Sequence, residues 1–277
     1  GANLPISTEI TGYAISGFLY LFQRLQDEEY LAAAELAGRF LLREAWDAQA
    51  KTFHFEVAGL QRYSYFFDCG IIARSLLWLY RSSRKEEFLE YAKLTCIAME
   101  RDFRALNGFH PIVKLPCKSP SPHEVWWSKM PGAFQLKAAL AWRELGERLA
   151  ETRFAALYEE QLFTSLGCYA ETLDNEEYRP KLMDRLHAWS YFLEGLQPVK
   201  ERADVQAVLA TALDRGERLL EDLQWQFVRS DACAQLLRAR LLEGDEASEA
   251  AVQRIESFQF AGDDPRLAGG FGFGRRD

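Results

Sequence analysis

Carboxylates recur along this chain inside short aromatic segments, at points where the sequence pattern predicts the start of a long helix. These residues are Glu9, Asp68, Glu124, Asp184 and Asp231. Cleavage of a glycosidic bond uses two carboxyl groups, one that is protonated and one that is ionised. The five residues are therefore candidates for acid–base chemistry. The competing interpretation is structural, because an acidic residue at a helix start caps the backbone and complements the helix dipole.

Asp68 and Glu124 have the most apolar neighbours among these carboxylates. Asp68 follows the aromatic run 65–67, and Glu124 stands just before Trp126 and Trp127. Apolar surroundings raise the pKa of a carboxyl group towards the value that a general acid needs. We therefore expect Asp68 and Glu124 to be the leading catalytic carboxylates. The supporting candidates are Glu9 and Asp184.

Two histidines offer a different chemistry. His123 and His187 stand at the predicted starts of two helices, where they could act as acid and base on a proton bound to carbon. This is the chemistry of a sugar epimerase or lyase. Arg185, two residues before His187, could pair with a sugar carboxylate through its planar guanidinium. The alternatives are hydrogen-bonded or surface histidines, and an arginine that bridges a neighbouring acid.

Aromatic residues make up 13% of the chain, including 7 Trp and 19 Phe. Such side chains can stack on the flat faces of sugar rings or fill a wide core. The predicted substrate-binding residues are Tyr13, Tyr65, Trp126, Trp127, Arg185, Trp189 and Asp231. For the aromatic members of this set, core packing is the competing interpretation.

Apolar residues at three- and four-residue steps predict helices that pair through short turns. The predicted hairpins are 9–25 with 27–46, 67–81 with 86–103, 129–145 with 151–172, 182–196 with 202–223, and 232–242 with 247–258. The connections between hairpins are longer and rich in Phe, Trp and Gly. Stacked hairpins place equivalent loops at one end of a molecule, so we expect the carboxylates to share one cleft there.

This organisation resembles a known family. The segments 8–13 (TEITGY) and 67–70 (FDCG) look like inner-helix openings of the (α/α)6 toroids of the six-hairpin glycosidase class. The loop 269–274 (GGFGFG) is similar to loops that precede such helices, and the likeness is greatest to uncharacterised bacterial members associated with polysaccharide biosynthesis. The resemblance implies an all-α toroid in one domain, residues 1–277. A complete toroid has twelve helices, so we expect the sixth hairpin to be missing or incomplete.

Composition excludes several classes of function. The net charge of −8 argues against nucleic acid as the main partner. The five cysteines are scattered without a CxxC pair, which favours a reducing compartment and disfavours zinc. We find no P-loop, Rossmann or HExxH motif, so no metal or cofactor is predicted. No apolar run is long enough to span a membrane, and we expect a cytoplasmic protein, although a removed signal peptide is compatible with the sequence.

The sequence thus predicts a carbohydrate-active protein that binds an oligosaccharide or polysaccharide at an aromatic, acidic mouth. A glycoside hydrolase would use the paired carboxylates. An epimerase or lyase-like enzyme would use His123 and His187. A third interpretation is a non-catalytic glycan-binding or scaffold protein of a polysaccharide biosynthesis system, so the sequence leaves open whether the chain is an enzyme.

Overall fold

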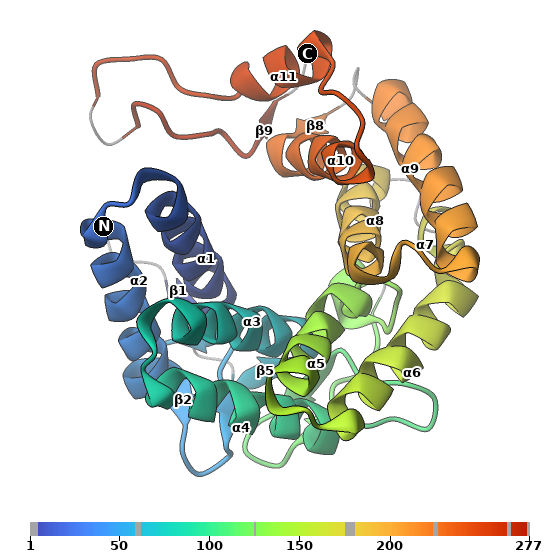
Figure 1. The fold of residues 1–277 in the computed structure, drawn as a ribbon. Coiled ribbons are helices and arrows are strands. Elements are labelled where there is room, and N and C mark those ends of the chain that lie inside the picture. Colours follow the sequence, from blue (N-terminus) through green and yellow to red (C-terminus); the bar gives the residue numbers. More distant parts are fainter. Residues whose placement is uncertain are drawn as a thin grey trace. The chain divides into compact units, whose positions relative to one another are not determined.

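A computed structural model describes residues 5–58, 62–124, 126–174, 181–223, 227–264 and 267–275. Helices dominate these residues (Figure 1). The backbone contacts divide the chain into two compact units. Unit 1 comprises Gly1–Pro131 and Gln135–Thr164, and unit 2 comprises Gly132–Phe134 and Ser165–Asp277. Each unit is described by itself, and the organisation into a single domain stays a prediction.

The helices of unit 1 form antiparallel hairpins close to the predicted bounds. They are α1 (Thr8–Leu25) with α2 (Glu28–Phe40), α3 (Phe66–Ser83) with α4 (Glu86–Asp102), and α5 (Gln135–Leu149) with α6 (Thr152–Cys168), which ends in unit 2. A π-helical turn, Leu41–Ala45, extends α2. The Ser7 hydroxyl accepts a hydrogen bond from the backbone N–H of Ile10, and the Asp27 carboxylate accepts one from Glu29, so capping residues start α1 and α2.

Helix α3 lies between α1 and α5 and is the most buried helix of unit 1. Its approach to both neighbours depends on small residues. A Cβ atom added to Gly12 would lie 3.4 Å from the Ile72 Cα, and one added to Gly70 would lie 2.5 Å from the Ala138 carbonyl oxygen. The close approach brings side chains in the first turns of α1, α3 and α5 into one neighbourhood.

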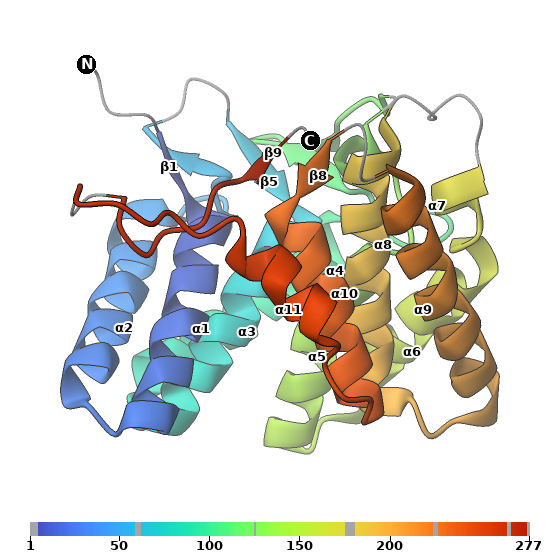
Figure 2. The same cartoon turned by 90° about the horizontal axis from the view of Figure 1, so that it is seen from above.

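Short antiparallel strands hold the helix starts of unit 1. The pairs are β1 (Ile6–Ser7) with β4 (Glu56–Val57), β2 (Trp46–Asp47) with β3 (Thr52–Phe53), and β5 (Tyr63–Tyr65) with β6 (Ile112–Lys114), which also pairs with β7 (Ser119–Pro120). Figure 2 shows β1 and β5 at one end of the unit, and the turn between α1 and α2 at the other. In the described residues of unit 1, these strands lie in the connections between helices and at the helix starts.

The start of the third inner helix was predicted wrongly. A helix was expected from residue 129, with His123 and Glu124 at its opening. In the structure, Trp127–Lys129 form a short 3-10 turn and α5 begins only at Gln135. Pro131 and Gly132 stand between them, and neither favours a helix interior. His123 and Glu124 therefore lie in a loop, while Val125 of the same segment is outside the described residues.

Unit 2 is built in the same way around α8. Its elements are α7 (Glu171–Asp174), α8 (Leu182–Leu196), α9 (Ala203–Leu223), α10 (Ser230–Glu243), α11 (Glu249–Glu256), β8 (Val228–Arg229) and β9 (Gly274–Arg275), with a 3-10 turn at Gln197–Val199. The predicted helix 151–172 is interrupted, because α6 ends at Cys168 and α7 begins at Glu171. Gly244 closes α10 in the left-handed conformation, at φ 94°. With α8/α9 and α10/α11, the described residues contain five hairpins.

Substitution of Gly70 tests the close contact between α3 and α5. Gly70→Ala should lower the free energy of unfolding by about 1–3 kcal/mol, because the added methyl group meets the backbone of Ala138. Gly17→Ala in α1 is the matched control, since nothing lies within 4 Å of its Cβ position. That control should stabilise the protein by about 0.5–1 kcal/mol. Urea unfolding measures both variants, and equal stabilities would contradict the packing described here.

Candidate functional site

Asp68 lies in the first turn of α3 but does not act as a typical capping residue. Its side chain is only 5% exposed, and the Oδ2 atom has no hydrogen-bond partner among the described residues. Burial raises the pKa of Asp68 well above its ordinary value, and the negative charge of Glu9 raises it further. A carboxyl group that is buried without a partner is favoured in the neutral form. The environment of Asp68 therefore favours its protonated form.

Glu9 lies in the first turn of α1, close enough to Asp68 for its negative charge to act on that residue. Burial raises the pKa of Glu9 to about 7, and the positive charge of Lys137 opposes that rise. Two neighbouring carboxyl groups in a buried site do not both ionise readily. The pair can therefore hold one proton and one negative charge near neutral pH, which is the arrangement that acid–base catalysis requires.

Lys137 is a site residue that the sequence analysis missed. It lies in the first turn of α5, and its side chain is only 5% exposed. Its ammonium nitrogen lies 5.1 Å from the centre of the Tyr13 ring, within the range of a cation–π interaction. A positive charge is unfavourable at a helix N-terminus. The predicted helix 129–145 placed Lys137 in mid-helix, so the sequence carried no signal of this position.

Tyr65 lies at the end of β5, directly before α3. Its ring centre is 4.6 Å from that of Phe55. Burial raises the pKa of Tyr65 to about 12, and the negative charge of Asp68 adds to the effect more strongly than that of Glu124. Tyr65 therefore lies near the buried carboxyl pair, and the negative charge of Glu124 also acts on it.

That loop is more exposed than the sequence analysis predicted. The Glu124 carboxylate accepts a hydrogen bond of 2.8 Å from the Lys129 side chain at the surface. The ring of His123 is exposed, and its centre is 6.3 Å from that of His110. Trp126 is exposed and Trp127 is half-buried. Glu124 thus lacks the apolar environment that was expected around it.

In unit 2, Arg229 joins two of the predicted carboxylates. Arg229 is 8% exposed and occupies β8, immediately before α10. Its Nε and Nη2 atoms donate to the two carboxylate oxygens of Asp231 at 3.0 and 2.6 Å, and Nη1 donates to Asp184 at 2.6 Å. This bidentate geometry suits a guanidinium and a carboxylate. Sequence analysis missed Arg229 because the bond to Asp184 joins residues far apart in the chain.

His187 lies on α8 beside this network. Its Nδ1 atom is 3.0 Å from the Gln235 side-chain oxygen and 3.4 Å from the Asp231 carboxylate. A proton on Nδ1 would satisfy both acceptors and leave Nε2 as the basic nitrogen. Burial opposes ionisation of Asp231, but hydrogen bonds from Arg229 and the charge of His187 outweigh it and lower the Asp231 pKa. His187 is therefore held in a defined orientation by polar partners.

Two other predicted residues of unit 2 lie outside this network. Arg185 is buried and donates to the backbone carbonyl of Thr172 at 3.2 Å. Trp189 is 0% exposed, and its indole N–H donates to the carbonyl of Ala212 at 2.9 Å. A ring that is enclosed on all sides has no face to offer to a sugar. Trp189 therefore packs the core of unit 2 and takes no part in the site proposed below.

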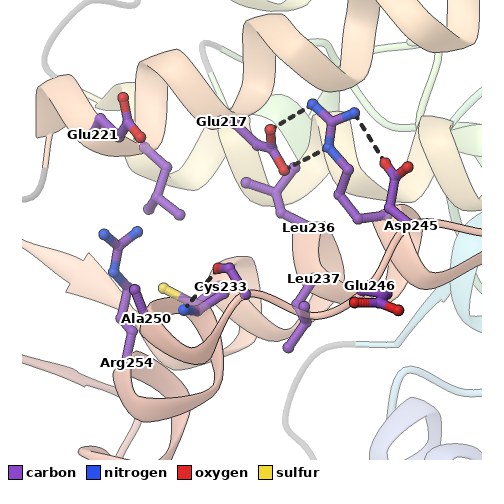
Figure 3. A pocket seen from close by; sticks show the side chains of 13 residues that line it. Glu217, Glu221, Cys233, Leu236, Leu237, Asp245, Glu246, Ala250 and Arg254 are labelled. Atoms are coloured by element: carbon purple, nitrogen blue, oxygen red, sulfur yellow. Dashed lines mark hydrogen bonds and ion pairs between the residues drawn. The ribbon is translucent and has the colours of Figure 1, made fainter.

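A cavity of about 460 Å³ in unit 2 is lined by residues of α9, α10 and α11 (Figure 3). Its walls include apolar residues and the ionic cluster around Arg240, whose guanidinium contacts Glu217 at 2.6 Å and Asp245 at 3.4 Å. None of the predicted site residues lines it. The sequence analysis gave no indication of this cavity.

Among the described residues, no cluster of three His, Cys, Asp or Glu side chains is placed to hold a metal ion. The described helices likewise include none with the length and hydropathy that a bilayer crossing requires. The predicted convergence of all five carboxylates on one cleft stays a prediction. Glu9, Asp68 and Glu124 belong to unit 1, whereas Asp184 and Asp231 belong to unit 2.

The raised pKa of Glu9 predicts how stability depends on pH. A group with a raised folded-state pKa stabilises the protein below its unfolded value and loses that contribution as the pH rises through the folded value. For Glu9 this window runs from 4.5 to about 7. The unfolding free energy of the wild type, measured against Glu9→Gln in denaturant titrations, should fall by up to about 3 kcal/mol across it. Parallel curves for the two proteins would contradict the burial of this carboxyl group.

Removal of Arg229 tests the ionic network of unit 2. Arg229→Met should lower the unfolding free energy at pH 7 by roughly 1–3 kcal/mol, because two carboxylates lose a partly buried counter-ion. The loss should shrink as the pH falls towards 3, since the lowered pKa of Asp231 depends on Arg229. Lys93→Met, which breaks an exposed pair with Glu151 in unit 1, is the control and should cost less than about 1 kcal/mol. Equal losses in the two variants would contradict the network.

Comparison with known proteins places this geometry in a fold. No family model matches the chain, and no curated protein matches it in sequence. Cellobiose 2-epimerase from Spirochaeta thermophila is similar in structure, with a TM-score of 0.70 and 14% identity over 98% of this chain and 78% of that one. A D-mannose isomerase has a TM-score of 0.66 and 10% identity, over 98% and 79% of the two chains.

A family 76 glycoside hydrolase (a mannosidase) from Bacteroides thetaiotaomicron also matches. Its TM-score is 0.59 at 13% identity, over 81% of this chain and 61% of the hydrolase. At these identities the similarity concerns the fold, and it confirms the expected all-α architecture. The chain has the fold of these (α/α)6 proteins, with five helical hairpins among the described residues.

Proposed function

We propose that the chain is a carbohydrate-active protein whose ligand binds at the first turns of α1, α3 and α5 in unit 1. The observation that carries this proposal is Asp68, a buried carboxyl group with an oxygen that lacks a hydrogen-bond partner. A buried polar atom without a partner is costly, and a ligand hydroxyl group would satisfy it. The structurally similar proteins support the choice of ligand, because an epimerase, an isomerase and a mannosidase all act on sugars.

The reaction that this site favours is hydrolysis of a glycosidic bond. Asp68 supplies the protonated carboxyl group and Glu9 the one that can ionise, as the two roles require. Glu124 remains an alternative source of the ionised carboxylate, and its charge reaches Tyr65. Tyr13 and Tyr65 are the aromatic residues next to the pair, where they could contact a sugar ring.

A second candidate function is epimerisation by proton transfer at carbon. The observation that favours it is His187, which Gln235 and Asp231 orient through Nδ1. An oriented imidazole with a basic Nε2 is suited to abstract a proton. The predicted pairing of this histidine with His123 stays a prediction, because the two residues belong to different units.

An oligosaccharide panel incubated in deuterated buffer distinguishes these functions. Hydrolysis would release new reducing ends, whereas epimerisation would place deuterium on carbon without bond cleavage. Ligand-dependent thermal stabilisation without either product would indicate a glycan-binding or scaffold protein. No stabilisation and no product across the panel would contradict the carbohydrate proposal.

Variants assign the reaction to its residues. Asp68→Asn should reduce hydrolysis at least 100-fold while the fold is retained, because the amide cannot donate a proton to a leaving group. Glu28→Gln is the control, since this exposed acid also lies in the first turn of a helix, α2. Its turnover should equal that of the wild type. Turnover that survives in Asp68→Asn but is lost in His187→Asn would transfer the reaction to unit 2.

A further inference from the structure

Lys137 is a buried cation in a position that no structural requirement of α5 explains. The first turn of a helix favours negative charge, and the side chain is almost fully removed from water. A charge at such a position is retained when it interacts with an opposite charge. Its charge acts on Glu9, and the Tyr13 ring lies beside the ammonium group. The interactions with Glu9 and Tyr13 therefore account for a lysine at this position, whereas the charge preference of the helix start does not.

The charge balance of the site follows from its three ionisable side chains. Two carboxyl groups and one ammonium group are neutral together when the carboxyl groups share a single proton. A second negative charge in this buried position would repel the first, and burial strengthens that repulsion. Of the two carboxyl groups, Glu9 is the one on which Lys137 acts, and Asp68 is the one with a buried oxygen that lacks a partner. The shared proton therefore belongs on Asp68.

We propose that Lys137 is the positioning residue of this site, which keeps Glu9 ionised and leaves the single proton on Asp68 as a hydrogen-bond donor to a ligand oxygen. The ligand then carries an oxygen acceptor next to Asp68, as the hydroxyl or glycosidic oxygen of a sugar does. Only this identification of the ligand rests on the proposed function. The protonation pattern itself belongs to the free protein.

Other titratable groups surround the pair, and they do not reverse this assignment. They are Tyr13 on α1, Tyr65 on β5 and Cys69 on α3, together with Tyr63, Glu124 and Glu56, which act on Tyr65. The pKa values of Tyr65 and Cys69 are raised to about 12 and about 11, so both are neutral at physiological pH. Lys137 is the cation whose charge opposes the effect of burial on Glu9.

Carboxyl titration by ¹³C NMR on the ligand-free protein tests the proposal. Glu9→Gln and Asp68→Asn assign the two signals. In the wild type, Glu9 should lose its proton at a lower pH than Asp68. The reverse order would overturn the proposal without any need for a lysine variant to fold.

Substitution of the lysine then tests its role. Lys137→Met should move the Glu9 titration upwards by at least one pH unit, and Lys137→Arg should restore most of the original midpoint. Lys93→Met removes an exposed lysine of α4 that is paired with Glu151. This variant is the control and should leave the Glu9 titration unchanged. A Lys137→Met protein that folds and titrates like the wild type would contradict the positioning role and leave only a packing role for Lys137.

Ligand binding provides a separate readout. With any sugar that stabilises the wild type, Lys137→Met should weaken binding at least tenfold, and Lys137→Arg should recover part of it. A confirmed titration order with no sugar bound would refute the proposed function and leave the protonation pattern intact. A sugar that binds to a protein with the reversed titration order would refute the protonation pattern and leave the proposed function intact.

Discussion

The close approach of α3 to α1 and α5 determines the chemistry of unit 1. Gly12 and Gly70 remove the side-chain volume that would otherwise separate these backbones. The first turns of the three helices then share one small volume, from which most water is excluded. A carboxyl group placed there cannot remain an ordinary surface carboxylate, because the low local dielectric penalises its charge. The packing thereby favours the protonated form of Asp68, and the positive charge of Lys137 favours the ionised form of Glu9.

The helical architecture was predictable because it depends on local patterns. Apolar periodicity and capping residues such as Ser7 and Asp27 belong to single segments, and the observed helices follow them. The prediction failed where two signals conflicted. The aromatic segment 123–127 resembled other helix openings, but Pro131 and Gly132 delay the helix until Gln135. Sequence likeness to a helix start therefore carried less weight than the backbone preferences of the residues that followed.

Only part of the candidate site could be predicted from the sequence, and the reason is physical. Glu9 and Asp68 could be found because each occupies a recognisable helix opening in its own segment. Lys137 and Arg229 could not, because each gains its role from carboxylates that lie far away in the chain. Trp189 shows the converse error, since an aromatic residue beside candidate polar residues proved to be core. The counter-ions of a buried site depend on tertiary contacts that the sequence pattern does not contain.

The pairing of β8 with β9 has a consequence for the histidine of unit 2. Arg229 faces Gly274 in this ladder, and its guanidinium lies 4.6 Å from the centre of the Phe273 ring. The glycine-rich tail therefore restrains the same guanidinium that anchors Asp231, which in turn faces His187. A displaced tail would remove this contact from the guanidinium and leave Gln235 as a remaining partner of the imidazole. Substitutions in the tail would thus act on the surroundings of His187 without changing any residue of α8 or α10.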